Sequence, residues 1–116
     1  MRTALARRVG AAAVGTLLLA SAAALAQQPA AKTAEIAIEN FKFVPAALTV
    51  APGTAVTWVN KDEEPHNIVN IDDQPRRFRS PAIDGGEKYS FVFAEPGTYR
   101  YICAVHPHME GIVVVK

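Results

Sequence analysis

The sequence predicts an all-β domain, a two-sheet sandwich, behind a cleavable N-terminal leader. Two observations favour this fold. Beyond residue 34 the chain consists of short segments in which apolar and polar residues alternate, and turn-forming residues such as Pro and Gly separate them. No stretch after the leader has sustained helical periodicity. About seven short antiparallel strands in roughly 90 residues are typical of two sheets packed face to face.

Residues 1–26 have the features of a secretory signal peptide. The start carries three arginines, the next stretch is apolar and rich in Ala and Leu, and it ends in a small-x-small cleavage pattern at Ala24-Leu25-Ala26. A retained membrane anchor is the alternative, but a spanning helix needs about 20 predominantly apolar residues and this stretch is slightly short. We therefore expect export to the periplasm, with no stable membrane insertion after cleavage.

Cleavage would leave a single domain. We expect residues 27–34 to be a flexible lead-in and residues 35–116 to be the folded domain. The leader removes three of the 12 basic residues and none of the 11 acidic ones, so the net charge falls from +1 to −2. This charge excludes a typical nucleic-acid binder. Because the chain has one cysteine, no intramolecular disulfide can form, and a bound metal could tether so small a domain instead.

The expected strands follow one another at short intervals. Residues 35–43 alternate, with Ile36 and Ile38 on one face, until a proline ends the run. Residues 51–54, Ala-Pro-Gly-Thr, have Pro and Gly where a tight turn needs them. Trp58 lies on an alternating strand and is expected in the core. The other strands are expected at residues 47–51, 55–59, 66–71, 87–94, 98–103 and 112–115.

Charged and irregular segments separate these strands. Asp62-Glu63-Glu64 is expected to be a solvated loop, and residues 72–86 are expected to be irregular. Arg76, Arg77 and Arg79 form the only basic cluster after the leader. They are either a second solvated loop or a docking patch for an acidic redox partner.

The residues with metal-binding chemistry gather in one segment. Cys103, His106, His108 and Met109 fall within seven residues, and the remaining histidine, His66, begins an expected strand. Core packing does not explain such a concentration. Thiolate and imidazole groups bind copper strongly, and a thioether adds a weak, long axial contact, which is the donor set of blue-copper electron-transfer sites. A zinc site is disfavoured by the methionine.

The sequence around these residues resembles the cupredoxins, the small blue-copper proteins. The resemblance covers residues 35–116, and two residues separate Cys103 from His106 and His106 from Met109. Such a short loop is most similar to that of the amicyanins. The matching motifs stand in the family's order, as Thr57-Trp58-Val59-Asn60, Pro65-His66-Asn67, Pro96-Gly97-Thr98-Tyr99-Arg100-Tyr101-Ile102-Cys103, His106 and Met109.

The resemblance implies a Greek-key sandwich of about seven to eight strands. It also implies one copper per chain, cycling between Cu(I) and Cu(II), with His66, Cys103, His106 and Met109 as its ligands. Asn67 is implied as a residue that braces the site from behind the ligands.

Two residues near the ligands leave more than one interpretation. In the family, the side chain that matches Asn67 often contacts a hydroxyl residue directly after the cysteine, and here that position is Ala104, which leaves only a backbone acceptor. His108 is expected to be a solvent-facing loop residue. The alternatives are a second metal contact or a titrating group near a partner surface.

The expected function is single-electron transfer in the periplasm by a monomer, with electrons passing through an exposed edge at His106. Redox partners such as a cytochrome c or a periplasmic dehydrogenase would dock there. The alternative is a copper-handling protein for delivery, storage or resistance, although the sequence lacks the Met-rich and His-rich repeats that favour it. An enzyme is disfavoured because multicopper chemistry needs more histidines and a filled four-ligand site leaves no open position for a substrate.

Overall fold

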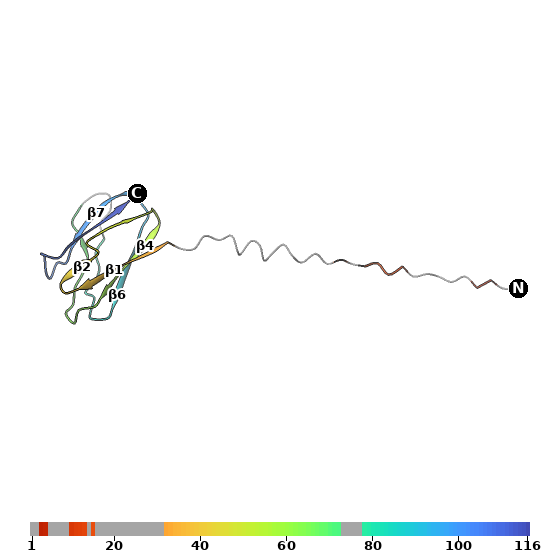
Figure 1. Cartoon of the computed structure of the whole chain (residues 1–116), viewed down its shortest axis with the longest axis horizontal. Coiled ribbons are helices and arrows are strands. Elements are labelled where there is room, and N and C mark those ends of the chain that lie inside the picture. The colour runs from red at the N-terminus through yellow and green to blue at the C-terminus, as the bar shows by residue number, and fades with distance from the viewer. Residues whose placement is uncertain (1–2, 5–9, 14, 16–31, 73–77) are drawn as a thin grey trace. The chain divides into compact units, whose positions relative to one another are not determined.

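The structure is a computed structural model of the 116-residue chain, and it describes residues 3–4, 10–13, 15, 32–72 and 78–116 (Figure 1). The chain divides into two units, Met1–Ala30 and Ala31–Lys116. Most of the expected signal peptide and of the lead-in lies outside the described residues, and those described in the first unit are all exposed. Among the described residues, none belongs to a helix long and apolar enough to cross a bilayer.

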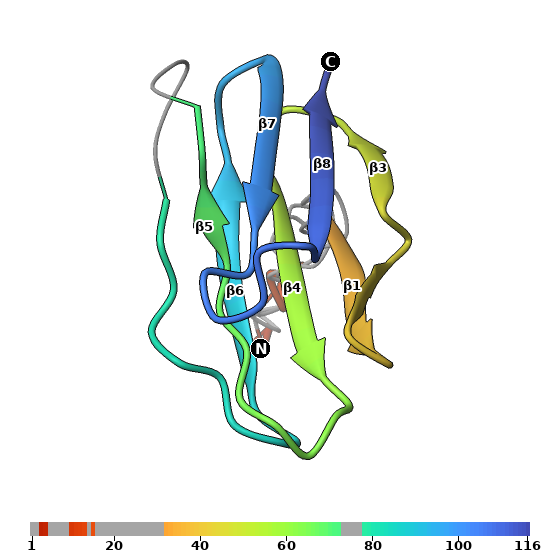
Figure 2. The same cartoon turned by 90° about the vertical axis from the view of Figure 1, so that its left-hand side faces the viewer.

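Eight strands in two four-stranded sheets make up the second unit. One sheet has the order β2-β1-β4-β6 and the other β3-β8-β7-β5. Figure 2 shows the second sheet in front of the first. From β3 to β7 each strand lies in the opposite sheet from the one before it, and the expected two-sheet Greek-key fold is confirmed. The strands are β1 Thr33–Glu39, β2 Lys42–Val44, β3 Ala47–Val50, β4 Thr54–Asn60, β5 Val69–Asn70, β6 Lys88–Phe93, β7 Gly97–Ile102 and β8 Glu110–Val115.

Most strand pairs are antiparallel, as the alternating pattern suggested, but both sheets are mixed. β1 pairs with β4 in parallel, and β3 pairs with β8 in parallel. The strands of each parallel pair are not consecutive in the chain. A short turn forces antiparallel pairing only between consecutive strands, as in β1–β2 and β7–β8.

The first expected strand is in fact two. Asn40 and Phe41 adopt left-handed backbone conformations, with φ of 53° and 57°, and form the two-residue turn of a β1–β2 hairpin. Positive φ at both central residues is the geometry of a tight hairpin turn. The burial pattern changes phase across it, because Ile36 and Ile38 are buried before the turn and Phe43 after it.

The segment expected as the fourth strand is mostly irregular. Only Val69–Asn70 forms a strand, β5, while His66 makes an isolated antiparallel bridge with Ile83. The described part of residues 72–86 is irregular as expected. The other strand boundaries agree with the expectation within two residues.

The core is built around aromatic rings between the sheets. Trp58 is fully buried, as predicted, and its ring centroid lies 5.4 Å from that of Tyr101. Cys103 and Met109 belong to the same buried cluster as Trp58. Two of the four expected copper ligands are therefore continuous with the hydrophobic core.

Candidate metal centre

The expected ligands come from two loops at one end of the sandwich. His66 follows the loop after β4, and Cys103 follows the end of β7. β4 and β7 both run downward in Figure 2, and the β7–β8 loop lies below the end of β7. The first loop crosses from β4 in one sheet to β5 in the other, whereas the second joins β7 and β8 of one sheet.

The β7–β8 loop is closed by its own backbone. The Cys103 N–H donates to the Met109 carbonyl at 3.2 Å, and the Met109 N–H donates to the His106 carbonyl at 2.9 Å. These bonds continue the β7–β8 ladder by one step and turn the chain back at the histidine. The ligand spacing read from the sequence thus corresponds to a compact loop.

Asn60 holds the other loop in place. It is fully buried, and its amide nitrogen donates to the carbonyls of Glu64 and Ile83 at 2.8 and 2.9 Å. Its side-chain oxygen accepts the Asp62 N–H at 3.0 Å. His66 then exchanges two backbone hydrogen bonds with Ile83. Such a satisfied buried network fixes the backbone from which His66 projects.

Three of the predicted ligand side chains converge. His66 Nδ1 and His106 Nδ1 are 3.2 Å apart, and Cys103 Sγ lies 3.8 Å from the first and 3.9 Å from the second. Among the described residues, these three form the one cluster of His, Cys, Asp or Glu close enough to hold a metal ion. Met109 is 2% exposed and ends the same loop.

The triangle of donor atoms has the size that a metal ion requires. A point equidistant from three atoms with these separations lies about 2.1 Å from each of them. Nitrogen and sulfur ligands bind a first-row ion such as zinc at roughly 2.0–2.3 Å. The side chains therefore fit a metal ion without rearrangement, and a thiolate with two imidazoles is a donor set that suits copper.

Asn67 makes hydrogen bonds to Cys103 and to the residue that follows it. The Asn67 N–H lies 3.5 Å from Cys103 Sγ, and the Asn67 side-chain oxygen accepts the Ala104 N–H at 2.7 Å. The contact joins the two ligand loops, as expected of a brace. Its direction differs from the expectation, because the backbone of Ala104 donates rather than accepts.

Two residues that were not expected at the site, Phe41 and Asp62, touch the imidazoles. The Phe41 ring meets those of His66 and His106 edge-on, with centroid distances of 5.3 and 5.0 Å. The Asp62 carboxylate lies 2.9 Å from His66 Nε2 and also accepts the backbone N–H groups of Asn40 and Phe41. The expectation of a solvated loop was therefore wrong for Asp62, whereas Glu63 and Glu64 are exposed.

The surroundings of Asp62 lower the pKa of its carboxyl group. Partial burial raises the pKa of Asp62, but the hydrogen bonds from Phe41, Asn40 and His66 outweigh that effect and leave the pKa below its usual value. The carboxylate is therefore ionised and can only accept hydrogen bonds.

The remaining candidates lie outside the donor triangle. His108 is exposed, as expected, and its ring centroid is 6.2 Å from that of His106. Arg79 is exposed, while Arg76 and Arg77 lie outside the described residues.

Comparison with known proteins identifies the family. Residues 30–116 match the model of copper binding proteins of the plastocyanin/azurin family. The chain is 36% identical over 102 residues to amicyanin-alpha of Methylorubrum extorquens, which covers 85% of each chain. It is 34% identical over 125 residues to amicyanin of Paracoccus denitrificans, covering 100% of this chain and 95% of the relative.

Solved structures agree with these sequence relatives. A mutant amicyanin in its Cu(I) form superimposes with a TM-score of 0.68 at 31% identity, over 78% of this chain and 88% of that one. The family match spans the whole β-sandwich and both ligand loops. The chain therefore belongs to the plastocyanin/azurin family of copper-binding proteins.

Proposed function

We propose that this protein is a blue-copper electron carrier that holds one copper through His66, Cys103, His106 and Met109. The observation that carries the proposal is the convergence of one sulfur and two imidazole nitrogens, 3.2 to 3.9 Å apart, at one end of the sandwich. The bound copper would supply a one-electron couple between Cu(I) and Cu(II).

The protein's contribution is a site that changes little when the electron arrives. Cys103 and His66 are fully buried. The backbone of His66 is held by hydrogen bonds with Ile83, and that of Cys103 by a hydrogen bond to Met109. A trigonal His-His-Cys set with a weak axial Met is a compromise between the preferences of the two copper oxidation states. A rigid frame that already has this geometry leaves little to rearrange during transfer.

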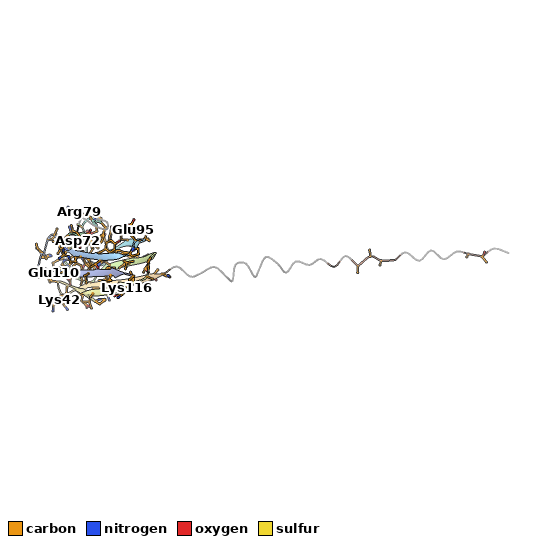
Figure 3. The ribbon with its side chains drawn as sticks, turned by 90° about the horizontal axis from the view of Figure 1, so that it is seen from above. Lys42, Asp72, Arg79, Glu95, Glu110 and Lys116 are labelled. Atoms are coloured by element: carbon orange, nitrogen blue, oxygen red, sulfur yellow. The ribbon has the colours of Figure 1, made fainter. Side chains whose placement is uncertain are left out.

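Electrons would pass through His106. His66 has no exposed surface, whereas the His106 side chain is partly exposed and its neighbour Val105 is 56% exposed. A redox partner, such as a cytochrome c or a periplasmic dehydrogenase, would dock against this edge. Figure 3 shows Lys42 and Glu110 at this end of the domain, away from Lys116, so the surrounding surface carries both signs of charge.

The cellular location is part of the same proposal. The signal-peptide features of residues 1–26 and the identity to amicyanins support export to the periplasm. There, a carrier rather than an enzyme is favoured, because four protein donors leave no open position for a substrate.

The test is the spectrum of purified protein loaded with Cu(II). A thiolate–copper site of this type should give an intensely blue solution and a narrow copper hyperfine splitting in electron paramagnetic resonance. Fast electron self-exchange with slow loss of copper would distinguish a carrier from a delivery protein. A pale product with ordinary tetragonal copper spectra would contradict the proposal.

A further inference from the structure

Asp62 occupies a position that links two parts of the site. Its side chain is 9% exposed, and each carboxylate oxygen has a partner: Oδ1 accepts the Asn40 N–H at 2.7 Å, and Oδ2 accepts the Phe41 N–H at 3.0 Å and faces His66 Nε2 at 2.9 Å. The turn residues are 21 and 22 positions away in the sequence. One carboxylate therefore joins the β1–β2 turn to a candidate ligand.

The hydrogen bond between Asp62 and His66 selects one tautomer of the imidazole ring. Because an ionised carboxylate only accepts, the hydrogen in the Asp62–His66 contact belongs to Nε2. Nδ1 then has a free lone pair, and it is Nδ1 that lies 3.8 Å from Cys103 Sγ. A hydrogen bond on the far nitrogen is the usual way in which a protein orients a metal-binding histidine and fixes its tautomer.

The bonds to the turn stabilise a strained backbone. A bulky residue such as Phe41, with φ of 57°, is unfavourable in the left-handed region. Hydrogen bonds to a charged acceptor are stronger than those to a neutral one, so Asp62 offsets part of that strain. Without the carboxylate, the two N–H groups would lose these partners and the turn would relax.

The β1–β2 turn positions the Phe41 ring against the two imidazoles. The ring stands nearly perpendicular to both imidazoles, at 87° to His66 and 86° to His106. It therefore limits the rotation of the buried histidine and of the partly exposed one. The sequence of contacts runs from Asp62 to the turn, from the turn to Phe41, and from Phe41 to both rings.

We propose that Asp62 is a positioning residue of the metal centre, which orients His66 directly and restrains His106 through the Phe41 turn. The proposal rests on the proposed function only in taking the two histidines as copper ligands. It predicts that removing the Asp62 carboxylate weakens metal binding more than removing one negative charge from a neighbouring exposed residue does.

The first test uses metal-free protein, so that it does not depend on copper. In Asp62→Asn and Asp62→Ala, the slowly exchanging His66 Nε2–H signal in nuclear magnetic resonance should be lost, and hydrogen exchange at the Phe41 amide should become at least about tenfold faster. Glu63→Gln is the matched control, because it removes the same charge from an exposed neighbour. If Asp62→Ala does not fold, Asp62→Asn decides alone.

The second test measures copper affinity and the visible spectrum. Loss of a residue that orients a metal ligand typically lowers metal affinity about 10- to 100-fold, and we expect this range for both Asp62 variants. The blue absorption should also shift in position or relative intensity, which a general loss of stability would not cause. The effects of Asp62→Ala and Phe41→Ala on affinity should be less than additive, since they act through one path.

The two tests separate the two proposals. If wild-type protein fails to form a blue site, the proposed function fails, while the metal-free measurements still decide the role of Asp62. If both Asp62 variants keep the exchange rates, the copper affinity and the spectrum of Glu63→Gln, the positioning role is wrong.

Discussion

Replacing Gly111 with alanine should destabilise the domain through Tyr101. Gly111 in β8 pairs with Tyr101 in β7. A Cβ at Gly111 would lie 2.6 Å from Tyr101 Cε2, and closer still to Cζ and Oη. Because non-bonded carbon atoms prefer roughly 3.5–4.0 Å, the ring would have to move by about 1 Å or more.

The surroundings leave the ring no space for that movement. Tyr101 is 1% exposed, and its ring centroid lies 4.8 Å from that of Phe43 and 5.4 Å from that of Trp58. Overpacking a core costs about 1–3 kcal/mol, and expelling the ring would approach the ~3–5 kcal/mol of truncating a buried aromatic residue. We expect Gly111→Ala to lower the free energy of unfolding by about 2–4 kcal/mol, and the melting temperature by roughly 10–25 °C.

Urea denaturation of metal-free protein provides the assay. In the double variant with Tyr101→Ala, the added methyl group has room, so the double variant should be no less stable than Tyr101→Ala alone. Gly53→Ala is the control: its Cβ meets no atom within 4 Å, and only its φ of +88° is unfavourable, at about 1 kcal/mol. A Gly111→Ala protein within about 0.5 kcal/mol of wild type, or fully additive losses, would refute the reasoning.

Three further predictions concern pH and colour. Burial raises the pKa of Tyr101 to about 12. Above pH 10 the unfolded chain loses a proton that the folded protein keeps, so the free energy of unfolding should fall by about 1.4 kcal/mol per pH unit up to pH 12, and Tyr101→Phe should lack this slope in denaturation curves. The pKa of Asp62 is lowered in the folded protein from a reference of 3.8. The stabilisation that this carboxylate gives is therefore present above that value and is lost as pH falls through the folded pKa. In acid denaturation, the free energy of unfolding of Asp62→Asn should depend less steeply on pH than that of the wild type. Cys103→Ser should abolish the blue absorption of the Cu(II) protein while far-ultraviolet circular dichroism stays unchanged, and a variant that remains blue would exclude Cys103 as a ligand.

The cluster of candidate ligands was predictable because most of it is local. Cys103, His106 and Met109 share one loop, and their spacing alone brings them together around a hairpin. His66 required the family resemblance, since it lies 37 residues before the cysteine. Alternation and turn residues located most strands, because each strand buries one face on a common core.

The unpredicted features depend on contacts between distant segments. The Asp62 carboxylate bonds to a turn more than 20 residues earlier, and nothing in Asp62-Glu63-Glu64 indicates which of the three acids turns inward. One signal for the turn was present: the apolar alternation changes from even positions, at Ile36 and Ile38, to odd positions, at Phe41 and Phe43. Such a change of phase indicates a break in a strand. The parallel pairing of β1 with β4 and of β3 with β8, by contrast, leaves no local pattern in the sequence.

The placement of the donors in two separate loops has a consequence for turnover of the protein. His66 lies in the segment that crosses from β4 in one sheet to β5 in the other, and Cys103 directly follows β7. A metal ion bound between them would tie this crossing segment to the β7–β8 loop, in a chain that has no disulfide. Copper-free molecules should then open at this end first and be the preferred substrates of proteases, so that the pool of intact carrier would follow the supply of copper.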